Sequence, residues 1–231
     1  MQINGAIFDM DGTLVDSLSF WGFMWHEVGK KYLGVDDFTP DEAVDKRVRT
    51  MIYNDAMAWV KEIYNIPGET EDFINFTLDG VEDFYRNVAM PKEGAVELLE
   101  YLTASGIKIC LASATEMKYI NIALEAHGLR KYFDAVLSCD DIGIGKDKPD
   151  IYILAAEALG EECAELCVVE DSFVALETAK AAGFKTVGVY DKYNFEQGRL
   201  KAAADIYLGE GSSLAELRKI FSQRRRKSNL L

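Results

Sequence analysis

The chain has 231 residues, of which 49% are hydrophobic, and this length suffices for one large domain or for one core with an inserted smaller unit. The formal net charge of −14 argues against a surface that binds nucleic acid or an anionic membrane, since both need net positive contacts. The sequence shows no apolar run long enough to span a membrane and no signal peptide, so we expect a cytoplasmic protein that neither enters nor binds membranes.

The first predicted element is a buried strand over the apolar residues 3–8. Asp9 and Asp11 follow its end with one residue between them. Like charges at this spacing repel, so either one carboxyl is protonated or a cation lies with the pair. Gly12 then allows a sharp backbone turn. Taken alone, this pattern is as typical of an ordinary Asp-Gly turn as of a functional site.

Residues 14–88 change character, because apolar and aromatic side chains recur there at helical spacing. The pattern predicts three or four amphipathic helices and no strand. The core of a small helical bundle explains the aromatic density, and Trp21 and Trp25 fit that core, with a cleft-facing position as the alternative. Arg47 and Arg49 are interpreted as surface residues, or else as groups that reach toward a substrate.

Helices and strands alternate from Pro91 onward. The predicted helices are 93–105, 116–127, 149–159, 173–182 and 213–222, and the predicted strands are 107–112, 135–138, 166–169, 186–190 and 206–208. This alternation predicts an α/β fold with a Rossmann-like, doubly wound parallel sheet and an active groove at the carboxyl ends of its strands.

The domain organisation follows from this change of pattern. We expect a core domain formed by residues 1–13 and 89–222, with an inserted helical cap domain at 14–88. The basic segment 223–231 is interpreted as a disordered tail, with an anion-binding arm as the second reading.

Further polar residues fall at predicted strand ends, namely Ser113, Lys146, Glu170 and Asp171. Each has an ordinary structural explanation, because a serine can cap a helix, a loop lysine can be solvated, and Glu170 with Asp171 can cap a helix. Their coincidence at one edge of one sheet favours a functional site.

Phosphoryl transfer suits these residue types. Several carboxylates in one cleft need a hard divalent cation, and oxygen ligands favour Mg²⁺ over zinc. Asp9 can attack phosphorus to form an aspartyl phosphate, and Asp11 can act as general acid and base. Ser113, with backbone N–H groups at a helix start, can bind a phosphate oxygen, and Lys146 can balance the charge.

With these motifs placed, nearly the whole chain resembles the haloacid dehalogenase superfamily, and within it the β-phosphoglucomutase-like phosphatases. The residues that carry the resemblance are Asp9-Met10-Asp11-Gly12-Thr13, Ala112-Ser113-Ala114-Thr115, Gly145-Lys146 with Lys148-Pro149-Asp150-Ile151-Tyr152, and Val168-Val169-Glu170-Asp171-Ser172. The insertion 14–88 looks like the helical cap of that family.

The resemblance implies a role for each matching residue. Asp9 would be the nucleophile and a metal ligand, and Asp11 would be the acid/base and give the metal its backbone carbonyl. Glu170 and Asp171 would complete the Mg²⁺ site. The phosphate would be held by Ser113, Ala114 and Lys146. Lys148 competes with Lys146 for that role, because this chain has Asp147 where the family often has proline.

The presence of Asp11 argues against dehalogenation, because a halide needs no proton when it leaves. We expect hydrolysis of a small phosphorylated metabolite, such as a sugar phosphate, by a monomer. The alternatives are a β-phosphoglucomutase-type phosphosugar mutase and a catalytically silent phosphometabolite sensor. In the resembling mutases a histidine follows the first motif closely, whereas here Trp21 stands in the matching region and His26 comes later.

The four cysteines, Cys110, Cys139, Cys163 and Cys167, are not spaced like a zinc site. We expect free thiols, as in a reducing compartment.

Overall fold

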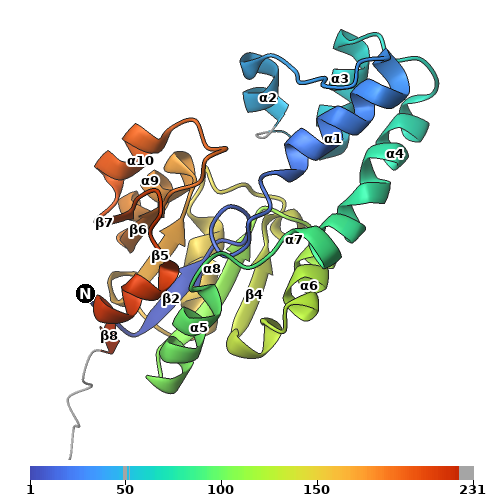
Figure 1. Cartoon of the computed structure of the whole chain (residues 1–231). Coiled ribbons are helices and arrows are strands. Elements are labelled where there is room, and N and C mark those ends of the chain that lie inside the picture. The colour runs from blue at the N-terminus through green and yellow to red at the C-terminus, as the bar shows by residue number, and fades with distance from the viewer. Residues whose placement is uncertain (49–50, 52, 224–231) are drawn as a thin grey trace, which may run out of the picture. The chain divides into compact units, whose positions relative to one another are not determined.

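The computed structural model describes residues 1–48, 51 and 53–223. They form two compact units (Figure 1). The sheet unit consists of Met1–Ser17 together with the chain from Ala89 onward, and the helical unit consists of Leu18–Val88. The expected tail at 223–231 lies outside the described residues, apart from the backbone of Gln223.

A six-stranded parallel sheet runs through the sheet unit in the order β4-β3-β2-β5-β6-β7. Its strands are β2 Gly5–Phe8, β3 Lys108–Ser113, β4 Ala135–Ser138, β5 Leu166–Glu170, β6 Lys185–Val189 and β7 Ile206–Leu208. The chain moves outward from β2 through β3 to β4 and then crosses back to β5, so the strand order reverses beside β2. The doubly wound, Rossmann-like parallel sheet predicted from the sequence is confirmed.

The central strands are covered on both faces. Ala6, Ile7 and Phe8 of β2 are all fully buried. Since successive side chains of a strand point to opposite faces, a strand covered on both sides needs an unbroken apolar run. On one face, Ile7 packs in a cluster with residues of α8, among them Ile151.

Six α-helices surround the sheet in the described part of the sheet unit. They are α5 Ala95–Ala104, α6 Met117–Ala126, α7 Cys139–Ile142, α8 Asp150–Leu159, α9 Phe173–Ala181 and α10 Gln197–Ala203. Short 3₁₀ segments cover Arg130–Tyr132 and Cys163–Glu165. The sequence interpretation did not include α7 or α10, because both are short and each buries one residue, Cys139 and Leu200 respectively.

Two predicted elements differ from the structure. The strand expected at 3–8 is divided, since β1 (Gln2–Ile3) pairs with β8 (Ser222–Gln223) in a separate two-stranded sheet. The helix expected at 213–222 is a 3₁₀ helix over Leu214–Lys219, capped by Ser213 and followed by β8. The pairing of β8 with β1 needs extended backbone there, which a helix to residue 222 would prevent.

The described residues of the helical unit form helices and no strand, as predicted. The helices are α1 Phe20–Val28, α2 Glu42–Val48, α3 Tyr53–Ile63 and α4 Thr70–Asp83, with π-helical turns at Gly29–Leu33 and Phe84–Val88. Aromatic side chains form its core: Trp25 is 2% exposed and donates from Nε1 to Asp45 Oδ1 at 3.0 Å. Trp21 packs beside Trp25 but is half-buried, so of the two tryptophans Trp25 is the one that lies in the bundle core.

The boundary between the units lies later than the residue 14 expected for the insertion. Val15 bridges to both Asp11 and Pro91, and the amide of Asp16 donates to the carbonyl of Met90 at 2.8 Å. These bonds tie residues 14–17 to the sheet unit, so the helical unit begins at Leu18.

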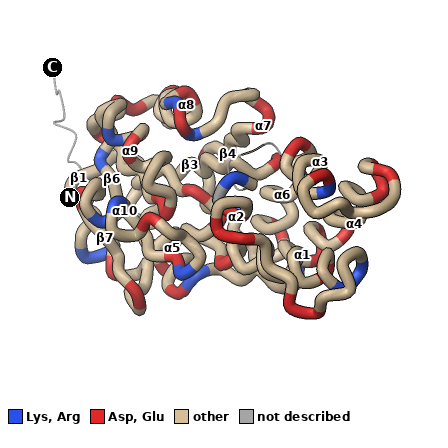
Figure 2. Tube along the Cα trace, turned by 90° about the horizontal axis from the view of Figure 1, so that it is seen from above, with Lys and Arg blue, Asp and Glu red and all other residues tan. Residues whose placement is uncertain are grey.

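The negative charge of the chain is not gathered at one place. Figure 2 shows acidic residues distributed along elements of both units. Most of them are solvated, which makes a buried group of carboxylates exceptional.

Candidate active site

The predicted site residues converge where the strand order reverses. Asp9 follows β2, Ser113 ends β3 and Glu170 ends β5, and these three strands are neighbours in register. The crevice at the carboxyl ends of the strands is where ligands bind in open α/β sheets.

The turn after β2 positions the two aspartates. The amide of Asp9 continues the ladder by donating to the carbonyl of Val169 at 3.0 Å. The chain then turns around Met10, whose carbonyl accepts from the amides of residues 13, 14 and 15. Gly12 has φ +79°, a left-handed conformation that costs glycine nothing. This tight turn presents Asp9 and Asp11 at the same edge of the sheet.

Three buried carboxylates meet at this edge. Asp9, Glu170 and Asp171 each offer an oxygen atom, and these atoms all lie within 4.8 Å of one another. Their exposed fractions are 6%, 1% and 5%. Burial, together with the charge of Glu170, raises the pKa of Asp9 well above its usual range and that of Asp171 to about 7.

Lys146 pairs with two of these three carboxylates. Its ammonium bonds to Asp9 Oδ1 and lies 2.5 Å from Glu170 Oε1. Burial alone would lower the pKa of Lys146, but the two carboxylates outweigh it and raise that pKa well above its usual range. Lys148, the competing lysine, is exposed. The structure therefore brings Lys146 to the acidic group and leaves Lys148 at the surface.

Asp11 has different surroundings. Its carboxylate accepts hydrogen bonds from three hydroxyls: Ser17 at 2.6 Å, Thr115 at 2.6 Å and Ser113 at 3.4 Å. Among the described residues, the group of three carboxylates does not include Asp11. A hydroxyl can donate to a carboxylate and can accept from a protonated carboxyl group. Hydroxyl neighbours therefore suit a carboxyl group that exchanges a proton.

The segment after β3 holds the predicted phosphate-binding residues. Ser113 is fully buried, Ala114 is exposed, and Ser113 Oγ accepts from the amide of Thr115 at 3.1 Å. Ser113 was expected to cap a helix at 116–127, but α6 begins at Met117 with Glu116 as its N-cap. Ser113 instead caps the turn that leads into the helix.

Some polar contacts around the site were not predicted. Tyr152 donates to Glu170 Oε1 at 3.2 Å, and Thr13 donates to Asp171 Oδ1 at 3.2 Å. Asn194 donates from its side-chain amide to the carbonyl of Asp171. Thr13, Thr115 and Tyr152 stand in the sequence motifs quoted above. Asn194 does not, although it follows the carboxyl end of a strand as the other site residues do.

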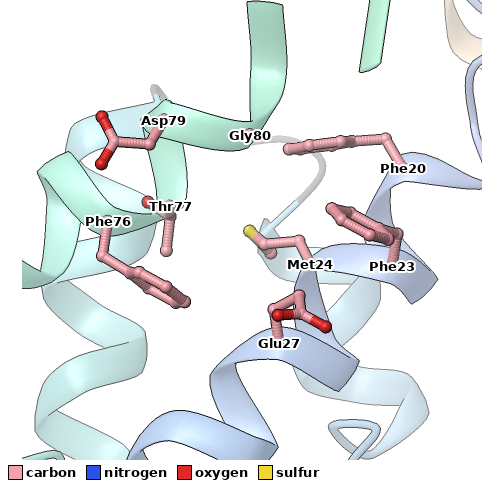
Figure 3. Close-up of a pocket in the computed structure, with 8 residues that line it drawn as sticks. All are labelled: Phe20, Phe23, Met24, Glu27, Phe76, Thr77, Asp79 and Gly80. Carbon is pink, nitrogen blue, oxygen red and sulfur yellow. The ribbon is translucent and has the colours of Figure 1, made fainter. Parts of the chain in front are cut away.

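A separate cavity of about 320 Å³ lies inside the helical unit, between α1 and α4. Figure 3 shows its wall of Phe20, Phe23, Met24 and Phe76, with Glu27 and Asp79 also lining it. None of the predicted site residues lines it.

Arg47, one of the two arginines considered in this unit, does not line that cavity either. Arg47 stacks on the ring of Trp59 at 4.4 Å, whereas Arg49 lies outside the described residues.

The donor set of the sheet unit fits a hard divalent cation. All its members are carboxylates, whose oxygen atoms are the ligands that hard cations prefer. Because these carboxylates are buried and repel one another, their ionised forms are unfavourable in free energy without a cation. Lys146 supplies part of that positive charge. Asp9, Glu170 and Asp171 are the residues that can hold such a metal.

The haloacid dehalogenase-like hydrolase family matches residues 3–183 of this sequence. The chain belongs to this family. The resemblance in the sequence motifs is thereby confirmed, as is the expectation of a hydrolase.

Relatives of this haloacid dehalogenase-like hydrolase extend over most of its length. A phosphorylated carbohydrates phosphatase of Thermotoga maritima is 28% identical over 203 residues, or 87% of this chain and 92% of the relative. The crystal structure of a provisionally assigned β-phosphoglucomutase from Thermotoga maritima has a TM-score of 0.77 at 26% identity, covering 95% of this chain and 98% of that one.

A predicted phosphoglycolate phosphatase from Haemophilus somnus shares the fold, with a TM-score of 0.79 at 20% identity and coverage of 95% and 98%. Within the described part of this hydrolase, no helix has the length and apolar character needed to cross a membrane. All four cysteines are free thiols.

Proposed function

We propose that the protein is a Mg²⁺-dependent phosphatase that hydrolyses a small phosphorylated metabolite, such as a sugar phosphate, through an aspartyl phosphate on Asp9. The observation that carries the proposal is the group of Asp9, Glu170 and Asp171 at the reversal of strand order, with Lys146 paired to Asp9 and Glu170. Family membership and the phosphatase relative support a phosphoric monoester hydrolase.

Each residue has a chemical task in this proposal. Bound Mg²⁺ would neutralise negative charge on the phosphoryl oxygens. Ser113 and the backbone N–H of Ala114 bind phosphate oxygens, and Lys146 balances charge beside Asp9. Asp9, Glu170 and Asp171 would hold the metal, and Asp11 would add its backbone carbonyl.

The reaction proceeds in two displacements. An oxygen of Asp9 attacks phosphorus, the ester P–O bond breaks, and Asp11 gives its proton to the leaving alkoxide. Asp11 then takes a proton from a water molecule whose oxygen attacks phosphorus. The bond between phosphorus and Asp9 breaks, which releases inorganic phosphate and restores the Asp9 carboxylate.

Substrate choice is assigned to the helical unit, which we interpret as the cap. A capped site excludes polymers and admits small metabolites. The carbohydrate specificity of the Thermotoga maritima phosphatase supports a sugar phosphate here. The proposed active form is a monomer.

The proposal is tested by release of phosphate from p-nitrophenyl phosphate and from a panel of phosphorylated metabolites, with Mg²⁺ and with a chelator. We expect Mg²⁺-dependent release that falls by about 10³-fold or more in Asp9→Asn, because the nucleophilic oxygen is lost. Asp141→Asn, which neutralises an exposed aspartate of the same unit, is the matched control and should retain activity. Full activity of Asp9→Asn would refute the assignment of the nucleophile.

The mutase alternative is supported by the structural similarity to the Thermotoga maritima protein assigned as a β-phosphoglucomutase. It predicts that β-glucose 1-phosphate and glucose 6-phosphate interconvert faster than phosphate is released. A sensor would bind a phosphorylated metabolite without turnover. His26 is the histidine nearest the first motif. Its Nδ1 lies 3.8 Å from Oδ1 of Asp37 within the helical unit.

A further inference from the structure

Asp171 is held in place by a loop that follows a different strand. The loop 190–196 joins β6 to α10, and Asn194 within it donates to the carbonyl of Asp171. The same amide nitrogen lies 3.4 Å from Asp171 Oδ2. Thr13 donates to the other carboxylate oxygen, Oδ1, at 3.2 Å. Asp171 is therefore fixed from two sides, by β2's turn and by this loop.

The orientation of the Asn194 amide is determined by its two neighbours. Its Oδ1 accepts from the backbone N–H of Glu196 at 3.1 Å, as in an Asx turn. The carbonyl of Asp171 can only accept, so it must face the NH₂ end of the amide. A flipped amide would lose both bonds at once.

The loop itself is anchored by a buried ion pair. Lys92 donates to Asp191 Oδ2 at 2.8 Å and to the carbonyl of Tyr190 at 3.1 Å. Asp191 is 3% exposed, and its other oxygen accepts from the amide of Tyr193 at 2.9 Å. Because both oxygens of Asp191 serve the loop, this buried carboxylate acts as an anchor and does not join Asp9, Glu170 and Asp171.

A second anchor joins the loop to β7. Gln197 donates from Nε2 to the carbonyl of Asp191 at 2.7 Å and to that of Asn194 at 3.3 Å. Its Oε1 accepts from the hydroxyl of Tyr207 at 2.9 Å. The backbone that carries Asn194 is thereby held at both ends.

We propose that Asn194 is a positioning residue that fixes Asp171 in the orientation needed for Mg²⁺ binding. The inference rests on the proposed function, since it presumes the metal site. Hydrogen bonds from residues outside the first coordination sphere fix the orientation of a metal-ligating side chain before the metal binds. The side chain then loses less conformational freedom on metal binding, and removal of such hydrogen bonds typically weakens metal affinity. Asn194 contacts only Asp171 among the three acidic residues, so its effect runs through that residue.

The experiment is calorimetric titration of the full chain with Mg²⁺. In Asn194→Ser the hydroxyl can still accept from the amide of Glu196, which keeps the turn, but it is too short to reach Asp171. We expect this variant to bind Mg²⁺ about tenfold more weakly than the unaltered protein. Thermal unfolding without metal shows whether the variant remains folded.

Asn4→Ser is the matched control. Asn4 directly precedes β2, so it lies at the amino-terminal end of the strand, away from the acidic group. Its side-chain amide donates to Glu161 at 2.9 Å and to Glu165 at 2.5 Å. This variant also removes an asparagine–carboxylate contact, but it should leave Mg²⁺ affinity unchanged.

A kinetic measurement separates positioning from chemistry. In Asn194→Ser the Mg²⁺ concentration for half-maximal phosphate release should rise by the same factor, while kcat at saturating Mg²⁺ recovers. If Asn194→Ser does not fold, Gln197→Glu replaces it, because a carboxylate cannot donate to the carbonyls of Asp191 and Asn194. Weaker Mg²⁺ binding is then expected from that variant.

The outcomes distinguish the two proposals. Equal Mg²⁺ affinity in the unaltered protein and in the tested loop variant overturns the inference and leaves the phosphatase proposal standing. Absence of Mg²⁺ binding by the unaltered protein overturns the metal site and the inference together.

Discussion

Asp171 is a buried acid whose charge the protein alone only partly stabilises. Burial and the neighbouring Glu170 raise its pKa from 3.8 to about 7, although Lys92 acts in the opposite direction. Thr13 and Asn194 donate hydrogen bonds to it. A divalent cation would supply the missing positive charge, so proton and metal compete for the same carboxylate.

This competition predicts that Mg²⁺ affinity depends on pH. Below about pH 7 the metal must displace a proton from Asp171, so affinity should fall by up to about tenfold for each further pH unit. Calorimetry at pH 8, 7 and 6 measures the change, and buffers of different ionisation enthalpy count the protons released. An affinity that stays constant over this range would contradict the assignment.

The stability of the metal-free protein should change in the opposite sense to that of an ordinary surface acid. Between about pH 4 and pH 7 the folded state binds a proton at Asp171 that the unfolded chain has released. The free energy of unfolding therefore falls as pH rises through this window. Asp171→Asn has the same shape and no charge, so it should lose this contribution. Urea unfolding at pH 5 and pH 8 makes the comparison.

At the scale of elements, α8 both covers the sheet and supports the site. Its apolar residues pack against β2, β3 and β5, which places Tyr152 of its first turn beside the end of β5. Tyr152 is 1% exposed and donates to Glu170 at 3.2 Å. The packing of α8 therefore fixes the direction of a hydrogen bond in the acidic group.

Tyr152→Phe should lower the free energy of unfolding by about 1–2 kcal/mol, because the ring still packs but a buried carboxylate loses a donor. Tyr132→Phe is the matched control, since Tyr132 makes a bond of the same length, 3.2 Å, to Glu100 at an exposed position. Its removal should change stability by less than about 0.5 kcal/mol. Urea unfolding of both variants tests this, and equal losses would show that burial is not the cause.

Elements with strong local patterns could be predicted from the sequence, and the contacts between distant loops could not. The runs that became β3 and β5 are apolar on both faces along most of their length, and the acidic residues Asp9 and Glu170 stand directly at strand ends. The pairing of β1 with β8 has no comparable local pattern, because each strand has two residues.

The same reasoning explains the residues that were missed in the site. Tyr152 and Asn194 reach Glu170 and Asp171 from segments whose approach depends on helix packing and loop anchoring. Neither of these is visible in residue spacing. Lys146 was favoured over Lys148 by the resemblance; in the structure Lys146 contacts Asp9 and Lys148 is exposed, and the role of Lys146 in phosphate binding stays a prediction.

At the scale of the whole molecule, the helical unit is an insertion whose two ends are adjacent. Asp16 and Met90 each lie two residues outside Leu18–Val88, and the amide of Asp16 donates to the carbonyl of Met90. The sheet, the acidic group and Lys146 all belong to the other unit. The chemistry and the proposed substrate choice are thus carried by different parts of the chain.

We expect a variant in which a short Gly-Ser linker replaces residues 18–88 to fold and to bind Mg²⁺, since the sheet unit keeps its own core. It should still release phosphate from p-nitrophenyl phosphate and lose its preference among phosphorylated metabolites. Circular dichroism, calorimetry and the metabolite panel measure the three properties. A folded variant with unchanged preference would place substrate choice in the sheet unit.

The adjacency of β2 and β5 has a consequence for synthesis on the ribosome. The hydrogen bond from Thr13 to Asp171 spans 158 residues of sequence, and β2 pairs with both β3 and β5. A growing chain can join β2 to β3 early, but its acidic group stays incomplete until β5 has emerged. The nascent enzyme would therefore remain inert toward cellular phosphate esters until the chain through Asp171 has left the ribosome.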